Sequence, residues 1–330
     1  MRLGALKIIA LDVCPNEGRA EDPCASYIDG PQGRRMSVKF GIRYCNTGRY
    51  VDPAQAIELV QAAEAAGFES AWTVEHTIIP RSYESPYPYT QDGKIPGVRA
   101  DTSLPDPQIW LAYVAARTTK IKLATGILIL PQHNPVICAK QVATLDHMSG
   151  GRVILGVGVG WLKEEFDALG VPFAERGART DDYIRALRTL WAEDVATYQG
   201  QYVSFHDVYM RPKPVRREVP IIIGGDSKPA ASRAGRLGNG YFPARGASPE
   251  LIDQVRQSAV KAGRDPASIE ITASMPDDPA TLSEMAAAGV SRVLVPVSTV
   301  GLKQRVNGPE DLVKFRDMID RYVALTPPED

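Results

Sequence analysis

Hydrophobic and polar positions follow two alternating patterns from residue 38 onward. Short apolar runs rich in Val, Ile and Leu alternate with longer segments in which apolar residues recur every three or four positions. The short runs predict strands of a parallel sheet, because such strands are covered on both faces and need no polar side. The expected strands are residues 38–45, 68–74, 121–130, 153–159, 220–223, 241–242, 269–273 and 290–297.

The segments between these runs predict amphipathic helices. The expected helices are residues 53–67, 105–119, 135–148, 179–192, 227–238, 249–262, 279–288 and 312–322. Eight strands that alternate with helices imply parallel pairing, since parallel neighbours need a crossover between them. The pattern therefore predicts an α/β fold, a (β/α)8 TIM barrel, and leaves an open doubly wound sheet as the alternative.

Two connections are too long to be simple turns. Residues 75–104 follow the second strand at the face where barrel active sites are built. Their tyrosines (Tyr83, Tyr87 and Tyr89) provide material for a wall or lid, and a solvated surface loop is the alternative. Residues 195–219 follow the fourth helix and alternate like a small structural hairpin.

Residues 1–36 differ from the rest of the chain. Residues 17–35 are rich in Gly, Pro and charge and have no helical or strand period, which predicts a disordered N-terminal extension. A second methionine, Met36, stands directly before the first strand, so an upstream start codon would account for this extension. We expect one barrel domain over residues 37–330, with insertions after the second strand and after the fourth helix.

The charges of the chain nearly cancel, with 38 Lys and Arg against 39 Asp and Glu. This balance argues against a nucleic acid or an anionic membrane as partner, because both select basic surfaces. No apolar run approaches the ~20 residues of a membrane span. The 4 cysteines form no C-x-x-C pair and no zinc-type cluster, so we expect reduced thiols and no metal. The first residues resemble an export signal only loosely, and a cytoplasmic protein is the expectation.

Ionisable residues follow two of the predicted strands. Glu75 and His76 come at the end of the second strand, and an imidazole there can donate a hydrogen bond or move a proton at neutral pH. His133, after the third strand, is a second candidate. A purely structural histidine is the alternative for both. The expected catalytic residues are therefore His76 and Glu75.

Glycines mark the end of the fourth strand. Gly156, Gly158 and Gly160 alternate before Trp161, which stands where a dinucleotide-binding motif needs its last glycine, so a Rossmann site is excluded. Alternate glycines either let a flat ligand approach the backbone or permit tight barrel packing. The sequence leaves both explanations open.

A second glycine-rich run leads from the fifth strand into a helix. Gly224 and Gly225 are followed by Asp226 and Ser227 at the predicted helix N-terminus. Free N–H groups and the helix dipole favour a phosphate at such a position. A plain N-capped turn is the alternative.

A set of short motifs runs in order from about residue 38 to residue 242. They are EH (75–76), GILILPQHNP (126–135), LDHMSGGR (145–152), GVGVGW (156–161), EEF (164–166), GVPF (170–173), ERG (175–177), PKP (212–214) and IGG (223–225). Together they resemble the bacterial-luciferase-like superfamily, and within it the oxidoreductases that use the deazaflavin coenzyme F420. No single motif is specific, but the set is.

This resemblance implies a barrel with a flavin or deazaflavin ring at the C-terminal ends of the strands. A non-proline cis peptide, which bulges against the ring in relatives, would fall near Gly126 and Ile127. Glu75 and His76 would face the ring and the substrate. The expected cofactor-binding residues are Gly126, Ile127, Gly158, Gly160, Trp161, Gly224, Gly225 and Ser227. Trp161 departs from sugar-phosphate dehydrogenase relatives, which carry a glutamate there, so this chain is not expected to be that enzyme.

The resemblance also implies the chemistry. We expect hydride transfer between F420 and a small organic substrate, with FMN-dependent monooxygenation, fed by a separate reductase, as the alternative. A flavin-binding barrel without turnover is a less favoured third possibility. Relatives are often dimers, which leaves a homodimer open. The acidic tail of F420 would need cations at the mouth, and the candidates are Arg176, Arg179, Lys228 and Arg233.

Overall fold

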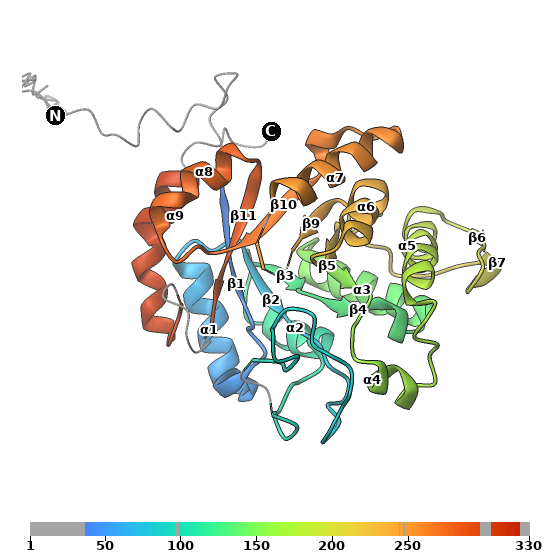
Figure 1. Cartoon of the computed structure of the whole chain (residues 1–330), viewed down its shortest axis with the longest axis horizontal. Coiled ribbons are helices and arrows are strands. Elements are labelled where there is room, and N and C mark those ends of the chain that lie inside the picture. Colours follow the sequence, from blue (N-terminus) through green and yellow to red (C-terminus); the bar gives the residue numbers. More distant parts are fainter. Residues whose placement is uncertain (1–36, 97–98, 244, 247, 298–304, 324–330) are drawn as a thin grey trace, which may run out of the picture.

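A computed structural model describes residues 37–96, 99–243, 245–246, 248–297 and 305–323. The predicted disordered extension at residues 1–36 lies outside the described residues. Within the described part, short parallel strands form one sheet (Figure 1). They are β1 (Lys39–Arg43), β2 (Ser70–Thr73), β3 (Lys122–Thr125), β4 (Leu128–Ile129), β5 (Val153–Gly158), β8 (Ile221–Gly224), β9 (Gly240–Phe242), β10 (Glu270–Ser274) and β11 (Val290–Pro296).

The sheet closes on itself. Its order is β3-β2-β1-β11-β10-β9-β8-β5-β4, and β3 also pairs with β5. Since β3 and β4 are the two halves of the predicted third strand, the described residues fill eight strand positions. The (β/α)8 TIM barrel is confirmed, and the open sheet is excluded.

Helices follow the strands and cover the outside of the barrel (Figure 1). They are α1 (Pro53–Ala65), α2 (Pro107–Ala115), α3 (Pro135–Ser149), α4 (Lys163–Ala168), α5 (Arg176–Ala192), α6 (Lys228–Leu237), α7 (Pro249–Lys261), α8 (Leu282–Ala287) and α9 (Arg316–Val323). The hairpin predicted within residues 195–219 is confirmed by the antiparallel strands β6 (Ala196–Gln199) and β7 (Ser204–Val208). Among the described residues, every helix is too short or too polar to cross a bilayer.

Three elements differ from the prediction. The third strand, expected as one run over residues 121–130, is broken between β3 and β4 at Gly126 and Ile127, where the resemblance had placed a cis-peptide bulge. Residues 163–168 form α4, where no helix was expected. The last predicted helix begins as the 3-10 segment η6 (Pro309–Phe315) before α9 continues it.

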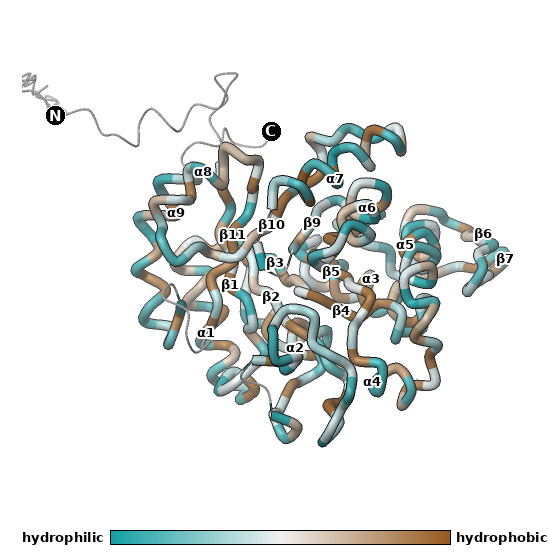
Figure 2. The backbone as a smooth tube through the Cα atoms, in the orientation of Figure 1, coloured by the Kyte–Doolittle hydropathy of each residue, from teal (hydrophilic) through white to brown (hydrophobic). Residues whose placement is uncertain are grey.

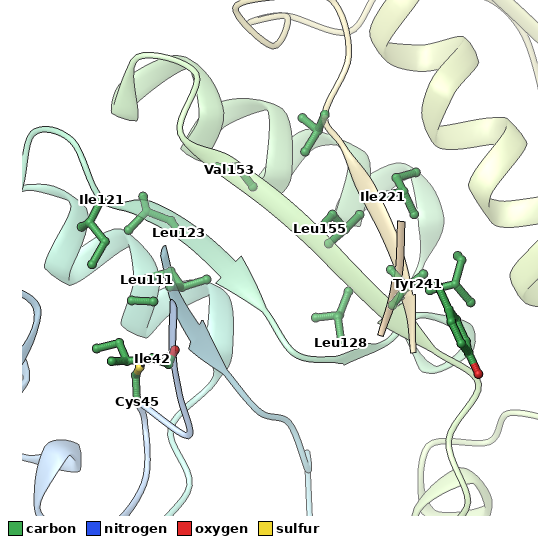
Figure 3. Close-up of a cluster of buried hydrophobic side chains, with 14 of the residues drawn as sticks. Ile42, Cys45, Leu111, Ile121, Leu123, Leu128, Val153, Leu155, Ile221 and Tyr241 are labelled. Carbon is green, nitrogen blue, oxygen red and sulfur yellow. Dashed lines mark hydrogen bonds between the residues drawn. The ribbon is translucent and has the colours of Figure 1, made fainter. Parts of the chain in front are cut away.

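The main hydrophobic core lies between the barrel wall and the helices. Figure 3 shows part of it, where Ile42, Leu123 and Ile221 from three strands lie in one cluster with Leu111 from α2. Figure 2 shows apolar colour along the strands and mixed colour along the helices, as expected for helices with one buried side. Each fully buried aliphatic side chain contributes about 1.5–3 kcal/mol.

The barrel interior is filled by side chains. Its central layer consists of Trp72, Ala124, Ile154, Ile222, Phe242 and Leu294. Toward the N-terminal ends of the strands, Arg292 pairs with Glu69 (3.0 and 3.1 Å) and Glu270 (3.0 Å). Burial alone would raise the pKa of Glu69, but the Arg292 guanidinium lowers it to about 2. At this end the charge of Arg292 is balanced by the two glutamates. We therefore look for a ligand site at the opposite, C-terminal mouth of the barrel.

Candidate active site

Glu75, directly after β2, is bound to the broken third strand. Its carboxylate accepts a hydrogen bond from the N–H of Ile129 (2.5 Å) and contacts Nε2 of His133 (2.8 Å). Glu75 is 7% exposed, so both contacts are made away from water. Glu75 and His133, which the sequence placed after two different strands, thus form one ion pair at the mouth.

Burial and charge act in opposite directions on His133. Burial lowers the pKa of its imidazole, while the hydrogen bond and the negative charge of Glu75 raise it. Asp106 and Glu165 add smaller raising contributions, and the net pKa is above the ordinary value. The carboxylate of Glu75 therefore favours the protonated form of His133.

His76 points to a different carboxylate. Its Nδ1 lies 3.2 Å from Oε2 of Glu165, a fully buried residue of α4. The other oxygen of Glu165 accepts from the N–H groups of Thr77 (2.6 Å) and Ile78 (3.2 Å). Glu165 thereby fixes both the imidazole and the start of the insertion. With Nδ1 oriented by a carboxylate, Nε2 is the nitrogen left to exchange a proton, as in other histidine–carboxylate pairs.

The insertion after β2 covers the mouth of the barrel. Asn46 joins its two ends, since its side-chain amide donates to the carbonyl oxygens of Val74 (2.8 Å) and Pro105 (3.0 Å). At the far side, Glu164 accepts from the N–H groups of Glu84 (2.7 Å) and Ser85 (3.1 Å). In Figure 1 this segment and α4 lie on the same side of the barrel.

Aromatic rings of the insertion pack on Trp161. The Trp161 ring meets those of Tyr83 (5.6 Å between centroids), Tyr87 (5.2 Å) and His76 (5.9 Å), and Tyr87 in turn meets Tyr89 (5.2 Å). These edge-on contacts support the interpretation of residues 75–104 as a wall or lid rather than a solvated loop. Trp161 is the point at which lid and histidine meet.

The predicted cis peptide between Gly126 and Ile127 is confirmed. It places the Ile127 side chain over two glycines, because a Cβ on Gly158 or Gly224 would lie 2.5 or 2.6 Å from Ile127 atoms. A Cβ on Gly160 would clash in the same way with Ile129 (2.7 Å). Tight packing thus explains why glycine stands at these positions, and their contact with a cofactor stays a prediction.

The turn that leads into α6 is the phosphate site predicted from the sequence. Gly225 has φ +121°, a conformation that other residues rarely adopt, and a Cβ there would lie 3.3 Å from that of Ala230. Ser227 is committed to capping α6, because its hydroxyl accepts from the N–H of Ala230 (3.3 Å). The Tyr89 hydroxyl lies beside this turn, 3.9 Å from where a Cβ on Gly225 would stand, and burial together with the Asp226 carboxylate raises the pKa of Tyr89.

Charges around this turn are partly paired. Arg245 contacts the Asp226 carboxylate through Nε (3.2 Å) and lies 5.9 Å from the Tyr89 ring centre. Of the cations expected to hold an acidic tail, Arg233 is bound to Asp181, and Arg176 donates to the carbonyl oxygens of Gly160 and Phe173. These contacts reduce what either arginine can offer to a ligand.

One candidate residue and one pairing escaped the sequence analysis. Glu165 was noted only within a motif, and the partnership of His133 with Glu75 was not foreseen. Both contacts join residues far apart in sequence, 89 positions for His76 and Glu165 and 58 for Glu75 and His133. The two adjacent glutamates of the EEF motif were the available sign of a functional carboxylate. Hydrophobic periodicity does not reveal which residue such a carboxylate contacts.

A closed α/β barrel with histidine–carboxylate pairs at the C-terminal ends of its strands defines a TIM-barrel enzyme. Residues 36–307 match the family model described as luciferase-like monooxygenase, and the chain belongs to this family. An uncharacterized protein of Mycobacterium tuberculosis is 37% identical over 187 residues, which are 57% of this chain and 65% of that protein. The match thus spans slightly less than two thirds of that relative's length.

Relatives that carry functional names use different coenzymes. The F420-dependent glucose-6-phosphate dehydrogenase of Kineococcus radiotolerans is 30% identical over 281 residues, 80% of this chain and 76% of that protein. The FMNH2-dependent dimethylsulfone monooxygenase of Pseudomonas putida is 35% identical over 214 residues, 62% of this chain and 53% of that protein. The coenzyme F420 dependent tetrahydromethanopterin reductase from Methanopyrus kandleri shares the fold, with a TM-score of 0.66 at 19% identity over 87% of this chain and 99% of that chain.

Proposed function

We propose that this protein transfers a hydride between coenzyme F420 and a small organic substrate. The observation that supports this most directly is the 30% identity to an F420-dependent dehydrogenase across 80% of the chain. The match to the FMNH2-dependent enzyme covers 62%. F420 is therefore the first choice and FMN the second.

The mouth of the barrel fits a phosphate-bearing ring cofactor. Gly225 has a φ of +121° that favours glycine, and the Tyr89 hydroxyl already lies 3.9 Å from where its Cβ would stand. These groups would hold a cofactor phosphate, with Arg245 to offset the Asp226 carboxylate. Ile127, which covers Gly158 and Gly224, would back the ring.

The chain's own residues supply orientation and a proton. A bound deazaflavin would provide the carbon that gives or takes the hydride. His76 presents Nε2 for proton exchange with the substrate while Glu165 holds Nδ1. Trp161 and the insertion tyrosines exclude water from this face. An oriented acid of this kind argues against a barrel that only stores flavin.

Cofactor titration tests the proposal. We expect about micromolar or tighter binding of F420 and much weaker binding of FMN, measured by quenching of the fluorescence of Trp161 and Trp72. Binding should weaken with salt, because exposed charges at the mouth are screened. Tight FMN binding without detectable F420 binding would instead support a monooxygenase that takes reduced flavin from a separate reductase.

A further inference from the structure

The barrel interior contains a second arginine, at the end opposite to Arg292. Arg43 is the last residue of β1 and is in register with Trp72, a member of the interior layer. Two residues earlier, a Cβ on Gly41 would lie 2.7 Å from Leu294, another member of that layer. Because alternate residues of a strand share a face, Arg43 faces the interior at the C-terminal mouth.

The two interior arginines differ in their partners. Arg292 is paired with two carboxylates, whereas Arg43 has no ion pair among the described residues. Arg43 is 8% exposed and its buried Nε has no hydrogen-bond partner in this part of the chain. Its guanidinium packs against the ring of Tyr44, 4.7 Å from the ring centre, which supplies no counter-charge. A buried cation without a counter-charge is costly, and so are buried donors without an acceptor.

The neighbours of Arg43 do not neutralise it. Tyr87 of the insertion lies close enough for Arg43 to affect its titration, yet burial keeps the pKa of Tyr87 above its ordinary value, so its hydroxyl stays neutral. On the same wall, Ser274 ends β10 in register with Leu294, and its buried hydroxyl also has no partner among the described residues. Two unsatisfied donors thus lie on the β1–β10 side, whereas the mouth carboxylates of Glu75 and Glu165 already hold histidines and that of Asp226 holds Arg245.

We propose that Arg43 binds a carboxylate of the substrate and so restricts the proposed oxidoreductase to substrates that carry such a group. The free Nε lets the guanidinium meet two carboxylate oxygens side by side, a geometry that lysine does not provide. Ser274 adds a hydroxyl donor on the same wall. That the bound anion is a substrate rests on the proposed function, whereas the binding of a carboxylate by Arg43 does not.

Benzoate and benzamide are suitable probes, because they have nearly the same shape and differ in charge. Titrations of the full chain, followed by tryptophan fluorescence with and without bound cofactor, should show benzoate binding at least about tenfold tighter than benzamide. In Arg43→Gln this preference should vanish, and in Arg43→Lys it should be reduced. Arg49→Gln is the matched control, since Arg49 also stacks on the next residue, Tyr50 (5.1 Å), but is exposed. It should retain the preference.

Thermal unfolding supplies an independent readout. Arg43→Gln removes an unpaired buried charge, so its Tm should equal or exceed that of the wild type. A lower Tm with an unchanged preference for benzoate would overturn the inference, because Arg43 would then be a structural residue. An equal loss of the preference for benzoate in Arg49→Gln would also overturn the inference, because the net charge of the protein would then be enough to explain the preference.

The cofactor must be separated from the substrate as the source of the anion. If Arg43→Gln weakens F420 or FMN as much as benzoate, and benzoate displaces the cofactor, the arginine serves the cofactor and the inference fails. If neither cofactor binds the wild type while the benzoate preference still depends on Arg43, the proposed function fails and the anion site stands.

Discussion

At the scale of single residues, Glu75 determines the protonation of His133. Burial and the carboxylate oppose each other there, and the carboxylate prevails. Glu75→Gln removes the negative charge that raises the pKa of His133 and leaves the lowering effect of burial. This pKa should therefore fall below the ordinary value of ~6.5. An NMR titration of the imidazole measures this. Glu165→Gln should produce a smaller shift, because Glu165 is a minor contributor, and equal shifts would contradict the assignment.

The same pair makes stability depend on pH. Because the folded-state pKa of His133 is raised, the stabilisation is fully present below its unfolded-state pKa and is lost as pH rises through the raised value. We expect His133→Gln to cost about 1–3 kcal/mol near pH 6, and this difference in unfolding free energy should shrink toward pH 9. Denaturant titrations at both pH values decide the point, and a difference that grows with pH would exclude a cationic His133.

Gly225 tests the predicted phosphate site. Gly225→Val combines an unfavourable φ with a side chain that fills the turn, so cofactor affinity should fall about 10- to 1000-fold. Gly67→Val is the control, because Gly67 also has a positive φ (+89°) but its nearest neighbour is Ile319, at 3.5 Å. Both variants should lose stability, and only Gly225→Val should lose cofactor. Unchanged affinity in a folded Gly225→Val variant would move the phosphate elsewhere.

At the scale of elements, the short helix α4 holds the insertion through Glu164. Burial raises the pKa of Glu164, but hydrogen bonds from Ser85 and Glu84 together outweigh it and lower that pKa to about 2. A depressed folded-state pKa means that the tether is present above the ordinary value and is lost only as pH falls through about 2. Glu164→Ala should therefore release the insertion at neutral pH.

Hydrogen exchange measures that release. In Glu164→Ala, the amides of Glu84 and Ser85 should exchange faster, and protease should cut the insertion sooner. Asp167→Ala is the control on the same helix, since Asp167 pairs with the exposed Lys163 (2.5 Å). Unchanged exchange at residues 84–85 would show that Asn46 and the aromatic contacts are sufficient to hold the segment.

The elements also show where periodicity informs and where it does not. Strands such as β5 and β11 are continuous apolar runs, and the run alone predicts them. The apolar run from 121 to 130 is equally continuous, but its backbone turns at Gly126, which hydrophobicity does not report. Helix α4 is only six residues long and owes its place to Glu165, whose partners come from a distant loop.

At the scale of the whole molecule, the N-terminal extension should be dispensable. The family match begins at residue 36 and the first described strand at Lys39. A chain shortened to begin at Met36 should therefore keep the Tm and the cofactor affinity of the full chain. A large fall in either quantity would show that the extension contributes to the barrel or its mouth.

Closure of the barrel was predictable and the pairing of its functional side chains was not. Eight alternating units are sufficient to predict the fold, because the crossover rule and burial act locally on each unit. The ends of the strands were likewise sufficient to select Glu75, His76 and His133 as candidates. Which acid meets which histidine depends on the break in the third strand and on α4, and both are products of the assembled structure.

The Tyr89 hydroxyl in the Gly225 turn has a kinetic consequence. A phosphate at the site proposed beside Gly225 would have to displace this hydroxyl, so the rate of cofactor association should rise with ligand concentration and then reach a ceiling set by lid opening. In stopped-flow mixing, Tyr89→Phe should raise that ceiling, whereas Tyr83→Phe, whose ring packs on Trp161 instead, should not. At high cofactor concentration, the rate of lid opening and not the amount of cofactor would then limit binding.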